Sequence, residues 1–134
     1  MTTSMFWADL ARDLEDPDFL REYIKESVRI ATTDAVINAL DEARVLAGLS
    51  KAELARTIGA EPAVVRRLFS SGNANPTLGT LAEVAAALGL RISVEPLPPA
   101  DREAVTEPLR AGRPSTTTAI RAAEMRGHRP PPTA

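Results

Sequence analysis

The sequence predicts an all-α fold that contains one short strand. Apolar residues recur every three or four positions in several stretches before residue 89, which is typical of amphipathic helices. Glycines that can end a helix follow three of these stretches, at Gly48, Gly59 and Gly89. Only residues 90–95 alternate apolar and polar side chains in the manner of a strand.

The N-terminal part of the chain is predicted to form three helices. Residues 5–15 place apolar side chains at helical spacing on a first short helix. Asp16 is a suitable N-cap for the next helix, and Pro17 suits its first position. We expect an interruption at residues 31–34, and then a third helix over residues 35–47 that stops at Gly48.

Residues 50–68 carry the most informative pattern. Ser50 and Glu53 have the spacing of a capping box at the start of a short helix, and Gly59 provides a sharp turn after it. A second short helix follows. The inner faces of this pair are predicted to consist of Leu54, Ala55, Ile58, Val65 and Leu68. Such a pair is a helix-turn-helix, which places its second helix in the major groove of DNA.

The outward face of the second helix follows from its geometry. At about 100° per residue, Ala63 and Arg67 point away from the side that carries Val65 and Leu68. Arg67 is predicted to read a guanine, because its planar fork matches O6 and N7, and Ala63 to contact a thymine methyl group. Arg66 lies on the flank and is expected to contact phosphate.

Residues beyond this helix are predicted to form a polar loop, one more helix, a strand and a tail. The helix starts at Thr77 or Thr80 and buries a stripe that consists of Leu81, Val84, Ala85 and Leu88. Because one strand is not stable alone, residues 90–95 are expected to pair with a second copy of the chain through Leu90, Ile92 and Val94. The segment from residue 96 is rich in Pro, Thr, Arg and Ala, which predicts disorder with a transient helix near residues 119–125.

Composition limits the function classes. The chain has 134 residues and a formal charge of −2, but basic side chains gather on the predicted helix pair. There is no cysteine, no apolar run of membrane-spanning length and no signal-peptide order, so we expect a cytoplasmic protein without a membrane partner. The single histidine, His128, lies in the predicted tail, and no phosphate-binding loop is present. An enzyme, a metal site and a cofactor are therefore not expected.

These motifs resemble a known family. The combination in residues 48–55, 58–59, 75–78 and 81–90 is similar to the lambda-repressor/Cro (XRE) helix-turn-helix domain. A narrower resemblance to HigA-type antitoxins rests on residues 15–19, Tyr23-Ile24, Gly72-Asn73, residues 75–78 and residues 87–94. It implies a lambda-repressor-like bundle, acting as a dimeric DNA-binding antitoxin that represses its own operon and neutralises a toxin.

The resemblance also implies which residues contact DNA. The base-reading positions of the family correspond to Pro62, Ala63 and Arg67. The family's phosphate-contacting positions correspond to Ser50, Lys51, Ser70 and Thr77, and helix geometry adds Arg66 on the flank. An apolar stripe ahead of the domain is either core packing or a partner surface, and consists of Trp7, Leu10, Phe19, Tyr23 and Ile24.

Two departures from the family bear on the expected chemistry. Glu61 and Pro62 stand at the start of the reading helix, where a carboxylate repels phosphate and a proline offers no side-chain donor. Many relatives pair a glutamate late in this helix with an arginine of the first helix of the domain. Here that glutamate is replaced by Phe69, so Arg44 is expected to meet solvent, the Phe69 ring or phosphate.

The predicted organisation has three parts, and three functions remain open. We expect an N-terminal helical extension over residues 1–33, an XRE-type domain over residues 34–95 and a disordered tail over residues 96–134. The leading hypothesis is the repressor that acts as an antitoxin, bound to operator DNA as a homodimer. The alternatives are a stand-alone XRE-family regulator without a toxin, and a protein-interaction module with a vestigial helix-turn-helix.

Overall fold

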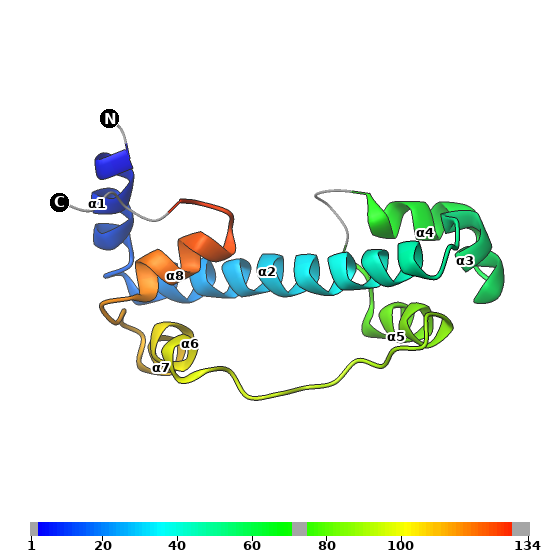
Figure 1. Cartoon of the computed structure of the whole chain (residues 1–134). Helices are drawn as coiled ribbons and strands as arrows, with labels where there is room; N and C mark the ends of the chain where they lie inside the picture. The colour runs from blue at the N-terminus through cyan, green and yellow to red at the C-terminus, as the bar shows by residue number, and fades with distance from the viewer. Residues whose placement is uncertain (1–2, 71–74, 130–134) are drawn as a thin grey trace. The chain divides into compact units, whose positions relative to one another are not determined.

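The computed structural model describes residues 3–70 and 75–129, in which every regular element is a helix (Figure 1). In chain order these are α1 (Thr3–Asp13), α2 (Pro17–Leu46), α3 (Lys51–Thr57), α4 (Pro62–Phe69), α5 (Leu78–Ala87), α6 (Pro99–Asp101), the π-helix η1 (Arg102–Thr106), α7 (Glu107–Ala111) and α8 (Thr118–Met125). The prediction of a helical fold is confirmed. Gly72 and Asn73, which contributed to the family resemblance, lie outside the described residues.

The chain forms two compact units. One unit comprises residues 32–95, and the other joins residues 1–31 to residues 96–134. The first of these ranges lies close to the range predicted for the DNA-binding domain. The second combines the two segments that the sequence analysis treated as separate, an N-terminal extension and a tail.

Helix α2 is one continuous helix, so the predicted interruption at residues 31–34 is wrong. Thr32, Thr33 and Asp34 are only modestly unfavourable inside a helix, and there is neither glycine nor another proline between Pro17 and Gly48. The start of α2 agrees with the sequence analysis. Its first residue is Pro17, and the Asp18 backbone N–H donates to Asp16 Oδ1 at 2.9 Å.

The unit of residues 32–95 is built around one apolar core. Its buried residues are Leu40, Leu54, Ala55, Val65, Leu68, Val84 and Ala85. They come from α2, α3, α4 and α5, so each of these helices presents one face to the same core. Ile58, Leu81 and Leu88 pack against it while partly exposed. The apolar stripes expected from helical spacing are therefore confirmed.

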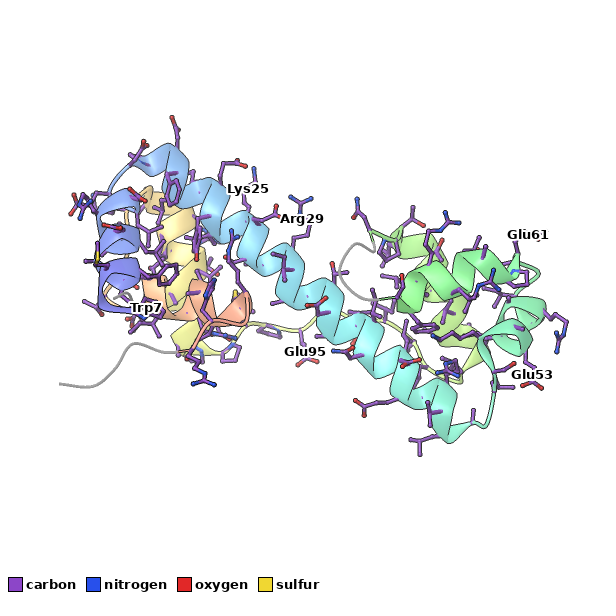
Figure 2. All side chains as sticks on the ribbon, turned by 90° about the horizontal axis from the view of Figure 1, so that it is seen from above. Trp7, Lys25, Arg29, Glu53, Glu61 and Glu95 are labelled. Atoms are coloured by element: carbon purple, nitrogen blue, oxygen red, sulfur yellow. The ribbon has the colours of Figure 1, made fainter. Side chains whose placement is uncertain are left out.

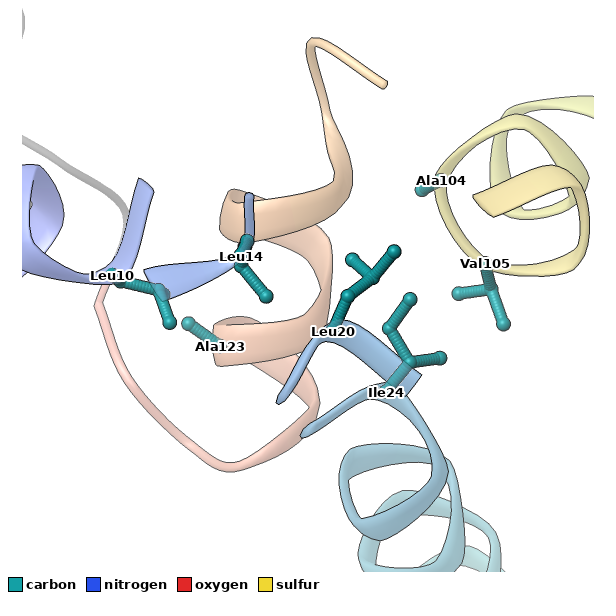
Figure 3. Packing of buried hydrophobic residues seen from close by; sticks show 7 residues of the cluster. All are labelled: Leu10, Leu14, Leu20, Ile24, Ala104, Val105 and Ala123. Carbon is teal, nitrogen blue, oxygen red and sulfur yellow. The ribbon is translucent and has the colours of Figure 1, made fainter. Parts of the chain in front are cut away.

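The other unit has its own core, to which both ends of the chain contribute. The buried residues are Leu10, Leu14, Leu20, Ile24, Ala104, Val105 and Ala123 (Figure 3). They belong to α1 and the turn after it, α2, η1 and α8. Side chains of the C-terminal segment are small where they meet the larger leucines and isoleucine of the N-terminal helices.

The prediction of a disordered tail from residue 96 is wrong. Prolines lowered the expected helix content, but Pro99 stands in the first turn of α6, where a missing N–H costs nothing. Pro108 directly follows the π-helical turn η1 within the same helical run. Polar contacts add to the apolar packing. Arg126 donates from Nε to Ser27 Oγ at 2.7 Å and from Nη2 to the Tyr23 carbonyl at 3.0 Å.

The predicted strand over residues 90–95 is also wrong. The Leu90 N–H donates to the Ala85 carbonyl at 2.8 Å, which closes the end of α5, and the residues that follow have no regular structure. A strand requires hydrogen bonds from a neighbouring backbone, and no described segment of the chain supplies them. Leu90, Ile92 and Val94 are exposed, and a dimer paired through this segment is not supported.

No helix in the described part of the chain combines the length and the hydropathy needed to cross a lipid bilayer. Within the same residues there is no group of three or more His, Asp and Glu side chains arranged to hold a metal ion.

A charge placed at a buried core position of α8 tests whether the segment after residue 96 is folded. Ala123→Asp should lower the free energy of unfolding by about 2 kcal/mol or more, because the carboxylate would be buried without a partner. Thr116→Asp introduces the same charge at an exposed position of the same segment and should have little effect. The measurement is urea unfolding followed by circular dichroism. Equal tolerance of both changes would show that residues 96–129 do not pack as described.

Candidate nucleic-acid interface

The start of α3 is fixed by a reciprocal pair of hydrogen bonds. The Glu53 N–H donates to Ser50 Oγ at 3.0 Å, and the Ser50 N–H donates to Glu53 Oε1 at 2.8 Å. This is the predicted capping box. Accepting the Ser50 backbone N–H lowers the pKa of the Glu53 carboxyl from its ordinary value. Glu53 therefore remains ionised and keeps the first turn of α3 in place.

A short turn joins α3 to α4. Gly59 has a φ of 68°, a region that residues with a Cβ rarely adopt, and the Ala60 N–H donates to the Ala55 carbonyl at 2.9 Å. Ala55 is fully buried in the core. Its small side chain allows the two helices to approach closely. The predicted glycine turn is thus confirmed, and it sets the direction in which α4 leaves α3.

Helix α4 has a buried side and an exposed side. Val65 and Leu68 are buried in the core of residues 32–95. Pro62, Ala63, Arg66 and Arg67 are exposed. Among the described residues, neither Arg66 nor Arg67 is in an ion pair with a carboxylate. The residues predicted to read bases therefore face solvent on one helix, where a ligand can reach them.

The predicted phosphate contacts lie at helix ends in the same unit. Ser50 and Lys51 stand at the start of α3, Ser70 directly follows α4, and Thr77 caps α5, as expected. The Ser70 hydroxyl donates to the Arg67 carbonyl at 2.9 Å. The Thr77 hydroxyl donates to Thr80 Oγ1 at 3.0 Å. Both hydroxyl hydrogens are engaged within the protein, so their contact with phosphate would require rotation of the hydroxyl group.

A hollow lies between α4 and the segment that begins α5. Its volume is about 290 Å³, and its lining residues are Val64, Arg67, Leu68, Asn75, Pro76, Thr77 and Thr80. Arg67 and Thr77 were predicted as separate DNA contacts, and the structure places them in one hollow with Val64 and Thr80. At about 100° per residue, Val64 falls on the flank of α4 between the buried and the outward face, and this spacing is the sequence signal that could have identified it. Helical spacing within α4 does not predict that residues 75–80 lie next to it, because that contact depends on the tertiary fold.

Glu61 and Glu53 project into solvent near the ends of the helix pair (Figure 2). Glu61 occupies the N-cap position of α4, yet its side chain makes no capping hydrogen bond. Its carboxylate thus stays free beside the first turn of α4. There it can accept from a cytosine amino group or repel a phosphate, as the sequence analysis expected.

Arg44 finds its partners within the domain. Its Nε donates to Asp41 Oδ1 at 2.9 Å, and its Nη1 donates to the Leu49 carbonyl at 2.8 Å. Its guanidinium carbon lies 5.7 Å from the centre of the Phe69 ring. Of the three expected alternatives, the structure therefore favours Phe69, and it adds Asp41 and Leu49. This arrangement connects the end of α2 to the end of α4.

The N-terminal apolar stripe is used mainly inside its own unit. Leu10 and Ile24 are buried in the core, and Trp7 and Tyr23 pack against it. Phe19 remains exposed and stacks on Tyr23, with 5.7 Å between ring centres. Burial raises the pKa of the Tyr23 hydroxyl, and Arg126 opposes this shift. Core packing, one of the two expected roles, accounts for four of the five residues.

The comparisons with known proteins address the same segment. Residues 40–94 match the family model described as helix-turn-helix. This supports the XRE family for a segment that covers less than half of the chain and contains α3, α4 and α5. It does not bear on the HigA-type antitoxins. No curated protein and no solved structure matched the chain.

Removing the Arg44 side chain tests its role in positioning α4. Arg44→Ala should lower the free energy of unfolding by about 1–3 kcal/mol, because the Leu49 carbonyl and the Asp41 carboxylate lose their donor. Arg29→Ala is the matched control. Arg29 pairs with Glu26 one turn away and is well exposed, so its loss should cost about 0.5 kcal/mol or less. Urea unfolding of both variants gives the comparison, and equal losses would contradict the role of Arg44.

Proposed function

We propose that this chain is a DNA-binding transcription regulator that inserts α4 into the major groove. The observation that carries the proposal is the exposed face of α4, whose opposite face anchors it in the core. The helix-turn-helix match over residues 40–94 supports it. An α-helix fits the major groove, where each base pair presents a distinct set of donors and acceptors.

Within this proposal, the residues of α4 have different tasks. Arg67 donates to O6 and N7 of a guanine, and Ala63 contacts a thymine methyl group. Arg66 contacts a phosphate from the flank. Lys51 and the backbone at the start of α3 contact phosphates that fix the position of the domain on the duplex. Pro62 and Ala63 offer no side-chain hydrogen bonds, so Arg67 carries most of the polar base readout.

We further propose that two copies of the chain bind one operator with two-fold symmetry. A single bidentate contact discriminates by about 1–3 kcal/mol. Specific operator recognition typically requires about 4–10 kcal/mol beyond non-specific binding. Two copies of α4 about 34 Å apart would double the readout and lie one DNA turn apart. This proposal assigns no surface to the contact between the copies.

As a finer proposal, the regulator is the antitoxin of a toxin–antitoxin operon, where it represses its own promoter and neutralises a toxin. The support is the resemblance of residues 15–19 and Tyr23-Ile24, which include the cap and the first turns of α2. Co-expression with the product of the adjacent gene, followed by purification through a tag on this chain, tests it. Failure to recover a complex, with the promoter still bound, favours the stand-alone regulator. Failure to bind the promoter at all favours the interaction module.

Arg67→Ala should weaken binding to the operator by about 1–3 kcal/mol and relax the preference at one base position. The reason is the loss of a bidentate donor to guanine. Fluorescence anisotropy with the promoter duplex and its single-base variants measures both effects at one fixed salt concentration. Arg29→Ala changes an exposed arginine of the other unit and should bind as the unchanged chain does. Retention of full specificity by Arg67→Ala would remove this residue from base readout.

Lys51→Ala should weaken binding to all DNA sequences by a similar factor. Because one phosphate contact is lost, the slope of log binding constant against log salt should become shallower by about one. Titrations at several salt concentrations, with the promoter and with an unrelated duplex, provide the measurement. A loss confined to one base position of the promoter would contradict a phosphate contact.

A further inference from the structure

One apolar side chain on α4 is exposed although its neighbour is buried. Val64 is 37% exposed, whereas Val65 is 0% exposed. Val64 and Arg67 are three residues apart, so they lie on the same side of the helix. Val64, beside the arginine that the proposed function assigns to guanine, is not among the residues that pack against the core of the domain.

The hollow of about 290 Å³ gives this valine a defined setting. Val64 and Arg67 both line it, together with Leu68 and Pro76. A water molecule takes up about 30 Å³ in the liquid, so the hollow is large enough for a small group from a bound duplex. Its apolar lining comes from Val64, Leu68 and Pro76, and its cationic lining comes from Arg67.

We propose that Val64 is a specificity-determining residue that accepts the 5-methyl group of a thymine adjacent to the guanine read by Arg67. This inference rests on the proposed DNA-binding function. The thymine methyl group is the apolar feature that sets a base apart in the major groove. Valine has no hydrogen-bonding group, so its readout of a base edge must be an apolar contact. Since Val64 and Arg67 share one side of α4, the thymine and the guanine are neighbours within one half-site.

The test compares thymine with uracil, which differ only by this methyl group. The chain of 134 residues first selects its preferred duplex from a random library at fixed salt. Each thymine of that duplex is then replaced in turn by uracil, and binding is measured by fluorescence anisotropy. Replacement of the thymine next to the guanine read by Arg67 should weaken binding about fourfold, because burying a methyl-sized group contributes about 0.8 kcal/mol. A thymine contacted by Ala63 is also sensitive to this replacement, but its sensitivity should persist in Val64→Ala.

Val64→Ala identifies the partner of that methyl group. This variant should bind the thymine duplex about fourfold more weakly and should no longer distinguish thymine from uracil at the sensitive position. Val45→Ala is the matched control, because Val45 is an exposed valine on α2 that does not line the hollow. It should retain the full difference between thymine and uracil. Because Val64 is a surface residue, thermal unfolding should show that both variants remain folded.

Three results would overturn the inference. One is that no uracil replacement next to the selected guanine weakens binding by the unchanged chain. Another is that Val64→Ala keeps the full difference between thymine and uracil. A third is that Val64→Ala weakens binding to unrelated duplexes by the same factor, which would assign Val64 to the DNA backbone. Each of these leaves the proposed function intact, whereas a chain that selects no duplex and binds no DNA overturns both.

Discussion

The burial of Val65 and Leu68 against Leu54 and Ala55 is the constraint on which the candidate interface depends. These contacts determine which side of α4 is inside, and the remaining side is left for solvent and ligand. An eight-residue helix is too short to be stable by itself, so its direction and its exposed face are set by this packing. Any change in the way α3 and α4 cross would turn Arg67 and Val64 together.

Several polar contacts hold this arrangement at its ends. The capping box of Ser50 and Glu53 begins α3, and Gly59 ends it with a positive φ. Arg44 connects the end of α2 to the Leu49 carbonyl and lies over the Phe69 ring at the end of α4. Many members of the resembled family pair this arginine with a glutamate late in the reading helix. In this chain Arg44 lies over the Phe69 ring and pairs with Asp41. The same element is anchored by different chemistry.

The unit that joins residues 1–31 to the C-terminal segment is stabilised differently. Its core combines leucines of α1 and α2 with small residues such as Ala104 and Ala123. Small side chains contribute little apolar area each, so helical spacing alone gives only a weak signal for them. Arginines supply the complementary contacts, as Arg126 does with Ser27 and the Tyr23 carbonyl. The unit therefore depends on residues nearly a hundred positions apart in sequence.

The sequence alone determined features that depend on neighbours within a few residues. These include the capping box, the glycine turn, the buried stripes and the outward face of α4, because caps, turns and helical periodicity are local. The tertiary structure decided what depends on distant partners. Residues 90–95 alternate like a strand, but no described segment offers a backbone for them to pair with. Residues 99–111 and 118–125 are helical, and their small apolar side chains pack against α1 and α2. Likewise, only the position of residues 75–80 beside α4 brings Val64 and Arg67 into one hollow with Thr77.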